Sequence, residues 1–439
     1  MKKTLYILLF IIVFTQVHSQ SWSPINGFGW VYALTVYNGD LIAGGPSGIA
    51  KWNGATWSQL GTGVDGEVDV LYVFNGKLYA GGRFLNAGGI PVSYIASWDG
   101  SVWADLEGGV NGYVTALTYY NNTLIAGGYF TSANGPANYI ASWNGSLWSP
   151  LGSGMGGAQG QVMALTVFSD LYAAGYFTTA GGLPANRIAK WNGTSWSALG
   201  NGVNNVVYAL TTYNGCLITG GLFSQAGGTY ANGVARWDGA SWTAFTYDVF
   251  SGLYPNVMCL TEYNGNLYVG GLFTNIGSIQ YNGIAKWNRF SWSHLGSGFT
   301  SSSNVCGAYA STIYNNLLVC GGIFNSAGGV PASNLAQWDG TIGINIISNK
   351  VPDSYKLYQN YPNPFNPSTK IRYTIKENGT VAIKVFDITG KEVKALVNEK
   401  QNAGEYEVTF NGNSLSSGIY IYKLESGDYS EAKKMTLLK

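Results

Sequence analysis

Histidine is nearly absent from this sequence, which contains two in 439 residues. His18 lies in an N-terminal segment that we expect to be removed, which leaves His294 alone in the mature chain. Catalytic Ser-His-Asp and Cys-His arrangements need a histidine with partners, and metal sites need several converging ligands. We therefore expect no catalytic residues, no metal site, no cofactor and no enzyme activity, and we expect His294 to be a packed or solvent-facing edge residue.

Long apolar runs are also missing. After residue 20 no segment is continuously apolar over the roughly 20 residues that a membrane span needs. The chain begins with a methionine and two lysines, continues with the apolar stretch Leu5 to Phe14, and then turns polar. A basic start, a short apolar stretch and a small residue at the junction are typical of a secretory signal peptide. The sequence predicts such a peptide at residues 1–19, with cleavage near Ser19 or Gln20.

Charged residues are scarce, at 10% of the chain, and the formal net charge is +1. This balance gives no reason to expect nucleic acid as a partner. The charges are unevenly distributed, because 22 of the 45 Lys, Arg, Asp and Glu residues lie in the last 89 positions. Two such different charge densities indicate two domains.

The first domain is dominated by an internal repeat of about 47 residues. Each copy has four short alternating segments, and Asn-Gly or Asp-Gly pairs between them predict two-residue hairpin turns. Four antiparallel strands at this period, with paired glycines and tryptophan, are typical of propeller blades. The sequence therefore predicts an all-β fold in which residues 20–340 form a seven-bladed β-propeller of four-stranded blades. The first tryptophan of the copies falls, at intervals of 45 to 51 residues, at Trp52, Trp98, Trp143, Trp191, Trp237, Trp287 and Trp338.

The two ends of the repeat region are complementary. The seventh copy ends at Asp339-Gly340 without a fourth strand, and the missing strand matches Trp22 to Ile25 near the N-terminus. We expect this N-terminal strand to complete the last blade and to close the ring, which removes an exposed sheet edge.

Four cysteines are too few for a scaffold built on disulfides. Cys259 and Cys320 occupy positions at which other copies have alanine, so we expect both to be small buried side chains between blades. Cys216 and Cys306 have no such assignment, and a bridge between cysteines stays open.

The blade pattern of Gly-Gly followed by tryptophan resembles that of kelch-type propellers. The fuller pattern, with Ala-Gly-Gly, Ile-Ala-x-Trp-Asn-Gly and Trp-x-x-Leu-Gly, is similar to the repeats of fungal cortical polarity-marker proteins and of bacterial surface propellers. The resemblance covers residues 22–340. The first copy departs from it, since Gly44-Gly45 leads to Trp52 without the Ala-Gly-Gly loop. We expect a shorter loop there.

Binding is predicted on one face of the ring. The short turns within the two hairpins of each blade share one face, and the long connections share the other. Aromatic and amide side chains on a rigid ring suit a polysaccharide or protein ligand, although loop polarity is also generic. The residues expected to bind are Arg83, Tyr94, Tyr129, Tyr139, Tyr176, Arg187, Tyr230 and Tyr281.

Residues 341–356 are predicted to be a linker, and residues 357–439 a small Ig-like β-sandwich, because alternating segments follow a proline-rich entry. The second domain closely resembles the type A C-terminal sorting domain of type IX secretion cargo. An ordinary Ig-like domain is the alternative. The residues that carry the resemblance include Asn363, Pro364, Phe365, Asn366, Pro367, Gly390, Gly418, Lys433 and Lys434.

This resemblance implies a protein that is secreted, or attached to the outer membrane at the surface of a gram-negative bacterium. It also implies three partners, namely the type IX translocon, its sortase-like peptidase and surface lipopolysaccharide. Our first hypothesis is a non-catalytic surface propeller that binds through its long-loop face. The alternatives are a structural or adhesion component without a discrete ligand, and a carbohydrate-active enzyme. A convergent pair of carboxylates would favour the enzyme, whereas Asp65, Glu67 and Asp69 are expected to be ordinary solvated loop residues.

Overall fold

The computed structural model describes residues 21–157, 160–245, 250–253, 255–302, 305–339, 344–348, 351–412 and 415–438. Within these ranges the regular elements are β-strands, and no helix there is long and apolar enough to cross a membrane. The chain divides into two compact units, of which the larger is Ser21–Gly343 and the smaller contains Ile344–Lys439. The predicted signal peptide at residues 1–19 lies outside the described residues.

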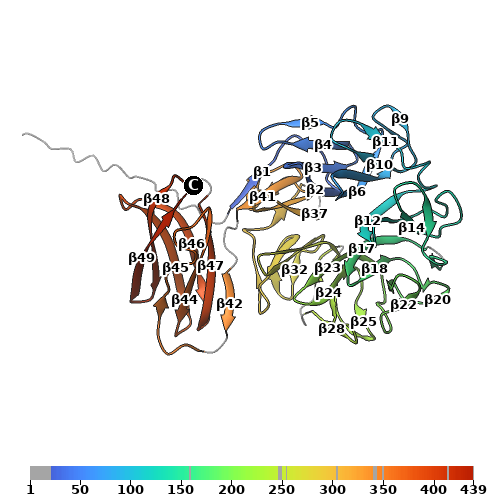
Figure 1. Cartoon of the computed structure of the whole chain (residues 1–439). Coiled ribbons are helices and arrows are strands. Elements are labelled where there is room, and N and C mark those ends of the chain that lie inside the picture. Colours follow the sequence, from blue (N-terminus) through green and yellow to red (C-terminus); the bar gives the residue numbers. More distant parts are fainter. Residues whose placement is uncertain are drawn as a thin grey trace, which may run out of the picture. The chain divides into compact units, whose positions relative to one another are not determined.

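The larger unit contains seven four-stranded antiparallel sheets among its described residues, numbered here 1 to 7 along the chain (Figure 1). Sheets 1 to 3 consist, from the innermost strand outward, of β2 (Ala33–Tyr37), β3 (Asp40–Gly45), β4 (Gly48–Trp52), β5 (Trp57–Gln59); β6 (Glu67–Phe74), β7 (Lys77–Arg83), β10 (Ile95–Trp98), β11 (Trp103–Ala104); and β12 (Val114–Tyr120), β13 (Thr123–Gly128), β14 (Ile140–Trp143), β15 (Trp148–Pro150). Sheets 4 to 6 consist of β17 (Val162–Phe168), β18 (Asp170–Gly175), β21 (Ile188–Trp191), β22 (Trp196–Ala198); β23 (Val207–Tyr213), β24 (Cys216–Gly221), β27 (Val234–Trp237), β28 (Trp242–Ala244); and β30 (Val257–Tyr263), β31 (Asn266–Gly271), β34 (Ile284–Trp287), β35 (Trp292–Ser293). Sheet 7 consists of β37 (Gly307–Tyr314), β38 (Leu317–Ile323), β41 (Leu335–Asp339) and β1 (Ser21–Pro24).

The sheets are arranged around a common centre, as Figure 1 shows. Each innermost strand contacts the innermost strand of the next sheet, from β2 to β37, and β37 in turn contacts β2. A cavity of about 230 Å³ at this centre is lined by residues of all seven innermost strands. The seven sheets therefore surround a central channel.

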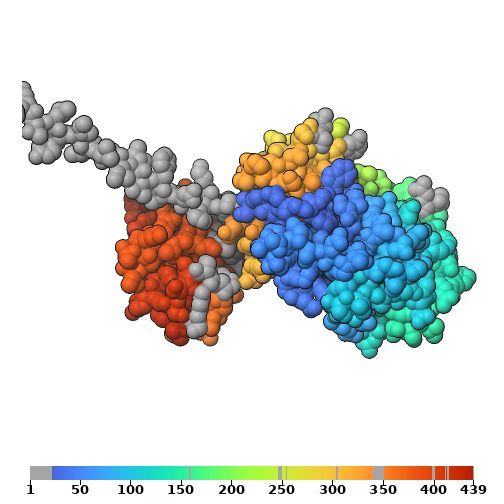
Figure 2. All heavy atoms as spheres, turned by 90° about the horizontal axis from the view of Figure 1, so that it is seen from above, coloured from blue at the N-terminus to red at the C-terminus, as the bar shows by residue number. Residues whose placement is uncertain are grey.

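The N-terminal strand completes sheet 7. β1 pairs antiparallel with β41, and Trp22 lies opposite Trp338 in this register. Figure 2 shows N-terminal residues (blue) against residues of sheet 7 (orange). Trp22 is buried, and its indole N–H donates a hydrogen bond of 2.8 Å to the Leu295 carbonyl of sheet 6. The sequence prediction that the two ends of the repeat share one sheet is confirmed.

Neighbouring sheets pack closely because glycine faces valine across the seam between them. A β-carbon on Gly44 would lie 2.6 Å from the Val68 side chain of sheet 2. Gly321 of sheet 7 faces Val31 beside sheet 1 in the same way. The paired glycines of the repeat thus permit contact between sheets, and the apolar core lies in the seams.

In six of the seven sheets a tryptophan of the outermost strand also forms a hydrogen bond to the sheet before it. The indole N–H of Trp103 donates to the Leu60 carbonyl, and that of Trp148 donates to the Leu106 carbonyl. Trp196 and Trp242 repeat the arrangement in sheets 4 and 5. The Trp-x-x-Leu-Gly pattern therefore encodes a contact between sheets.

The cysteine prediction is confirmed for two positions. Cys259 and Cys320 are buried in the seam between sheets 6 and 7. Cys216 and Cys306 are partly buried, and all four cysteines are free thiols.

The two kinds of hairpin turn differ. Between the first and second strands, Asn38 and Gly39 both have positive φ, at 50° and 84°, which fits the predicted two-residue turn. The connection from β4 to β5 contains four residues, so the two-residue prediction is wrong there. The Asn53 side chain accepts hydrogen bonds from the N–H groups of Ala55 and Thr56, which stabilises this longer turn.

The smaller unit consists of two four-stranded antiparallel sheets. Tyr373 of one sheet donates a hydrogen bond to Gln401 of the other, and apolar residues from both are buried. Residues 344–348, which the sequence assigns to a linker, form β42 and pair with β47. This pairing covers what would otherwise be an unpaired sheet edge. The two sheets are β42 (Ile344–Ser348), β47 (Gly404–Asn411), β44 (Ser368–Ile375), β43 (Lys356–Leu357); and β46 (Glu392–Gln401), β45 (Gly379–Asp387), β48 (Gly418–Ser426), β49 (Tyr429–Leu437).

Closure of the ring by β1 is testable by substitution. Trp22→Ala removes a buried indole and its hydrogen bond, and we expect it to lower the free energy of unfolding of the larger unit by about 3–5 kcal/mol. All 15 tryptophans lie between Trp22 and Trp338, so tryptophan fluorescence during urea unfolding follows this unit. Trp30→Ala is the matched control, because the Trp30 side chain is half exposed. Equal losses in both variants would contradict the role assigned to β1.

Candidate functional site at the channel mouth

The innermost strands carry a bulge near the channel mouth. In sheets 2 to 7 the pairing register shifts by one residue at the same position, for example between Val68 and Val70. A bulge inserts an extra residue and redirects its side chain. The residues at this position differ from sheet to sheet, and four of those that line the channel are Asp69, Thr115, Met163 and Tyr208.

The long connections on this face support one another. A short hairpin within the connection between the second and third strands pairs with the connection that enters the same sheet. Asp65 accepts hydrogen bonds from the N–H groups of Leu85 and Asn86, and Asn111 does the same for Thr131 and Ser132. Asp65 therefore organises a loop, a role that the sequence expectation of a solvated carboxylate missed. The hairpin strands are β8 (Asn86–Ala87), β9 (Ile90–Pro91), β19 (Thr179–Ala180), β20 (Leu183–Pro184), β25 (Gln225–Ala226), β26 (Thr229–Tyr230), β32 (Asn275–Ile276), β33 (Ile279–Gln280), β39 (Ser326–Ala327) and β40 (Val330–Pro331), and the entering strands are β16 (Met155–Gly156), β29 (Phe250–Ser251) and β36 (Phe299–Thr300).

Sheet 1 has no such hairpin. Only Pro46 and Ser47 connect β3 to β4, which confirms the predicted shorter loop.

Two carboxylates of sheet 2 converge on one arginine. Arg83 Nε lies 3.2 Å from Asp69 Oδ2 and 3.4 Å from Glu67 Oε2. Burial raises the pKa of the Asp69 carboxyl to about 6, Arg83 opposes the shift, and Glu67 adds to it. Asp69 therefore gains a proton in the folded protein at a higher pH than in the unfolded chain.

A group of tyrosines continues from this ion pair onto sheet 3. The Arg83 guanidinium lies 5.0 Å from the centre of the Tyr113 ring, within the range of a cation–π contact. Tyr113 also contacts Tyr94 and Tyr129, with ring centres 5.6 and 6.2 Å apart. About two fifths of the side-chain surface of Tyr113 and Tyr129 is exposed.

The same pattern extends to sheet 4. Tyr139 of sheet 3 packs against Gly160, in the connection that enters sheet 4. The Arg187 guanidinium lies 4.3 Å from the centre of the Tyr176 ring and donates a hydrogen bond to the Phe177 carbonyl. We call this surface the tyrosine arc, and it consists of Arg83, Tyr94, Tyr113, Tyr129, Tyr139, Tyr176 and Arg187.

Three residues of the arc adopt a backbone conformation that bulky side chains disfavour. Tyr94, Tyr139 and Arg187 precede the third strands of sheets 2, 3 and 4, with φ of 64°, 66° and 65°. Sheets 5 and 6 have Gly233 and Gly283 at the equivalent position. A non-glycine residue in this region costs on the order of 1–3 kcal/mol, and such residues cluster at functional sites.

The arc contains six of the eight residues predicted to bind. Arg83, Tyr94 and Tyr129 meet through Tyr113, and Tyr176 pairs with Arg187. Tyr230 and Tyr281 lie outside it, on connections of sheets 5 and 6. Tyr281 is buried and stacks on His294, with ring centres 4.4 Å apart. His294 is itself exposed while it stacks on Tyr281, so it is a solvent-facing edge residue, one of the two environments expected for it.

Sequence reasoning missed Tyr113 and the pairing of Glu67 and Asp69 with Arg83. The sequence does contain an indication of these residues. Most copies of the repeat have a valine at the start of the innermost strand, such as Val68, and the residues directly before and after this valine differ between copies. The valine packs in the seam between two sheets, and the variable residues lie on either side of it.

The arc can stack on flat apolar faces and exchange neutral and charge-assisted hydrogen bonds. Among the described residues there is no group of three or more His, Cys, Asp and Glu side chains placed to hold a metal ion.

In the smaller unit, the proline-rich entry packs onto the last strand. Phe365 is buried, donates its backbone N–H to the Thr436 carbonyl, and contacts the Phe410 ring. The Asn363 side chain accepts a hydrogen bond from the Thr436 N–H. Gly418 pairs with Leu437, Lys433 forms an ion pair with Glu431, and Lys434 is exposed. Gly390 follows the Asp387 turn with φ of 82°.

The raised pKa of Asp69 makes a prediction about pH. Because its pKa of about 6 exceeds the ordinary value of 3.8, ionisation of Asp69 costs more in the folded than in the unfolded chain. Its contribution to stability is therefore most favourable below about pH 4 and is lost as the pH rises through 6. Asp69→Asn removes this term, so stability of the variant relative to the parent should increase from pH 4 to pH 7 by on the order of 2 kcal/mol.

Urea unfolding followed by tryptophan fluorescence at several pH values measures this difference. A difference that is constant between pH 4 and pH 7 would contradict the assigned burial of Asp69.

Comparison with known proteins places the smaller unit. Residues 359–437 match the family model described as the secretion system C-terminal sorting domain. Among curated proteins, no sequence matches the chain.

Two solved structures are similar to this chain at low identity. One is PorZ, described as an essential bacterial surface component of the type-IX secretion system of Porphyromonas gingivalis, with 16% identity and a TM-score of 0.47. The match covers 94% of this chain but spans only 60% of the PorZ chain. The other is a protein of unknown function from Bacteroides thetaiotaomicron, with 9% identity, a TM-score of 0.39, and coverage of 73% of this chain and 72% of that chain. Scores this low do not assign the fold.

The match at residues 359–437 indicates a protein that is exported by the type IX route and resides outside the cell or at its surface. The C-terminal unit of this secreted, cell-surface protein is a secretion system C-terminal sorting domain.

Proposed function

We propose that this protein is a non-catalytic, seven-bladed β-propeller of the bacterial surface that binds a polysaccharide through the tyrosine arc. In this proposal the seven sheets are the blades, in the manner of kelch-like repeats. The two sheets of the smaller unit form an Ig-like sandwich.

One observation carries the proposal. Tyr94, Tyr139 and Arg187 keep bulky side chains at positions where the backbone favours glycine, and they do so only in the three sheets that form the arc. A strained residue persists when its side chain contributes something that the fold alone does not require. The exposed Arg83, Tyr113 and Tyr129 supply neighbouring stacking faces and hydrogen bonds, which a sugar chain can use.

The sorting domain supports the cellular setting of this function. We propose that the type IX translocon recognises it, that a sortase-like peptidase removes it, and that the propeller is attached to surface lipopolysaccharide. The bound polysaccharide would then be met outside the cell.

Hydrolysis is the competing function, since Glu67 and Asp69 converge as the carboxylates of a glycosidase do. Arg83 lies between them and forms ion pairs with both, which favours a structural role. Release of new reducing ends from a bound polysaccharide, abolished by Asp69→Asn and Glu67→Gln, would favour the enzyme instead.

Binding is tested with the chain from residue 21 to 439 on an array of neutral and acidic bacterial polysaccharides, followed by calorimetric titration. Tyr94→Asn and Tyr139→Asn are suitable variants, because Asn334 occupies the equivalent position in sheet 7 with φ of 66°. These variants keep the backbone and lose the ring. We expect each to weaken binding roughly 2- to 10-fold, the range for one aromatic stacking contact.

Tyr361→Ala is the control, because Tyr361 is exposed in the smaller unit. Absence of saturable binding to every polysaccharide, or equal affinity in all three variants and the parent, would refute the proposal. Saturable binding of a surface protein in place of a polysaccharide would leave the arc as a site and change its ligand.

A further inference from the structure

The seam between sheets 5 and 6 departs from the repeat. In sheets 2 to 5 and 7 the tryptophan of the outermost strand donates its indole N–H to the carbonyl of a leucine in the preceding sheet, and in sheet 1 Trp57 donates to the Asn26 carbonyl. At this seam the leucine position holds Phe245, three residues after Trp242, and the glycine that follows in other copies is Thr246. The Trp292 Nε1 atom is buried and has no hydrogen-bond partner in the described structure.

An unpartnered buried N–H is costly, and in a natural protein it calls for an explanation. The same donor is satisfied in sheets 2 to 5 and in sheet 7. The seam between sheets 5 and 6 therefore lacks a hydrogen bond that the equivalent tryptophan forms in other sheets.

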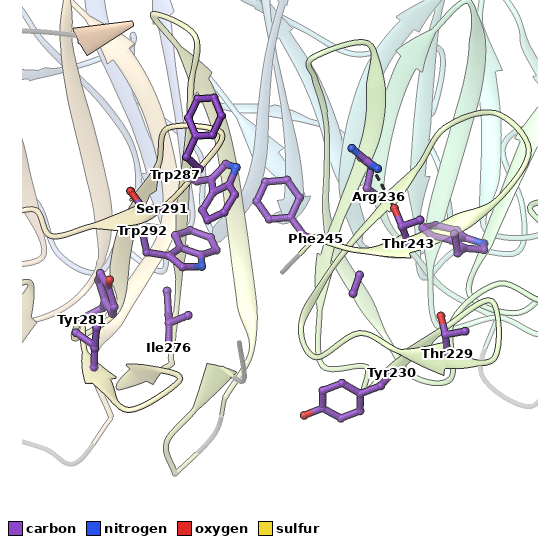
Figure 3. Close-up of a pocket in the computed structure, with 14 residues that line it drawn as sticks. Thr229, Tyr230, Arg236, Thr243, Phe245, Ile276, Tyr281, Trp287, Ser291 and Trp292 are labelled. Carbon is purple, nitrogen blue, oxygen red and sulfur yellow. Dashed lines mark hydrogen bonds between the residues drawn. The ribbon is translucent and has the colours of Figure 1, made fainter. Parts of the chain in front are cut away.

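A cleft opens at this seam. It has a volume of about 1090 Å³, which is large enough for an extended ligand. Figure 3 shows Phe245 between the side chains of Trp287 and Trp292 of sheet 6 and those of Arg236 and Thr243 of sheet 5.

Aromatic side chains line much of the cleft, and several of them reach solvent. Tyr230 and Phe290 are each about half exposed, at 52% and 49%. Phe245 meets the rings of Trp287 and Trp292 at 5.3 and 6.0 Å between ring centres. The cleft therefore offers broad aromatic surfaces next to water, a site for a ligand with flat apolar faces.

The polar groups of the cleft favour a ligand rich in acceptors. Arg236 is the one charged side chain among the fourteen described residues that line it, and none of the fourteen is Asp or Glu. Arg236 Nε donates to Thr243 Oγ1 at 3.2 Å, which uses one of its five N–H groups. The other N–H groups of Arg236 and the N–H of Trp292 favour an anionic ligand that carries further oxygen acceptors.

We propose that this cleft is a second binding site, for a segment of an acidic polysaccharide. A sugar ring stacks on the aromatic lining, its carboxylate pairs with Arg236, and one of its oxygens accepts the Trp292 N–H. None of these residues belongs to the tyrosine arc. The proposal for this cleft therefore does not depend on the function proposed for the arc.

The test uses two ligands that differ only in charge, an oligogalacturonate and its methyl ester. Calorimetric titration of the chain from residue 21 to 439 should show saturable binding of the acid, with binding of the ester roughly 10-fold weaker. Arg236→Gln should bring the two affinities together. Trp292→Phe keeps an aromatic ring and removes the N–H, and it should weaken binding of the acid roughly 3- to 10-fold.

Two controls separate the possible outcomes. Tyr113→Ala alters the tyrosine arc and should leave oligogalacturonate binding unchanged. Both Trp292→Phe and Trp196→Phe lose ring contacts, but only Trp196→Phe also loses a hydrogen bond, to the Leu151 carbonyl, so it should lower the unfolding midpoint more than Trp292→Phe does.

Absence of saturable binding by oligogalacturonate overturns the proposal, as does equal binding of acid and ester. Binding that is lost in Tyr113→Ala and retained in Trp292→Phe and Arg236→Gln also overturns it, because the ligand would then occupy the arc.

Discussion

The larger unit depends on the pairing of β1 with β41. Without β1, sheet 7 would end in the bare edge of β41, and the Leu295 carbonyl would lose its tryptophan donor. Because each innermost strand contacts the next, this pairing joins the two ends of the repeat and fixes the positions of all seven sheets around the channel. The pairing also covers the edge of β41, which would otherwise be open to pairing with another chain.

Many of the residues that recur in the repeat form contacts between neighbouring sheets. At most seams glycine on one sheet faces valine on the next, and an outer tryptophan donates to a leucine carbonyl of the preceding sheet. These contacts explain which positions recur in the sequence. They also explain why one altered seam, at Phe245, changes the outer surface without disturbing the pairing of the inner strands of sheets 5 and 6.

Between these constant positions a few positions vary from copy to copy, and the tyrosine arc lies among them. In sheets 2 to 5 the bulge at the start of the innermost strand directs a variable residue into the channel. The residue after the last glycine of the second strand is Arg83, Tyr129 and Tyr176 in sheets 2 to 4, while the equivalent positions of sheets 5 and 6 hold Leu222 and Leu272. The tyrosine arc thus lies on sheets 2 to 4 of the larger unit, and the separate C-terminal unit supplies the export signal.

The sequence alone determined the number of repeats, the missing strand of the last copy, the burial of Cys259 and Cys320, and the sorting domain. Each of these depends on periodicity or on a local motif, and both are read along one chain. It also found six residues of the arc, because they lie on the predicted long loops.

Only the tertiary structure decided which of those residues meet. Tyr113 joins Arg83, Tyr94 and Tyr129 across a seam between two sheets, and no spacing in the sequence specifies that contact. The conversion of predicted linker into β42 has the same cause, since its pairing partner lies about 60 residues further on. Contacts between distant segments are set by how neighbouring sheets pack, and that is a property of the folded chain.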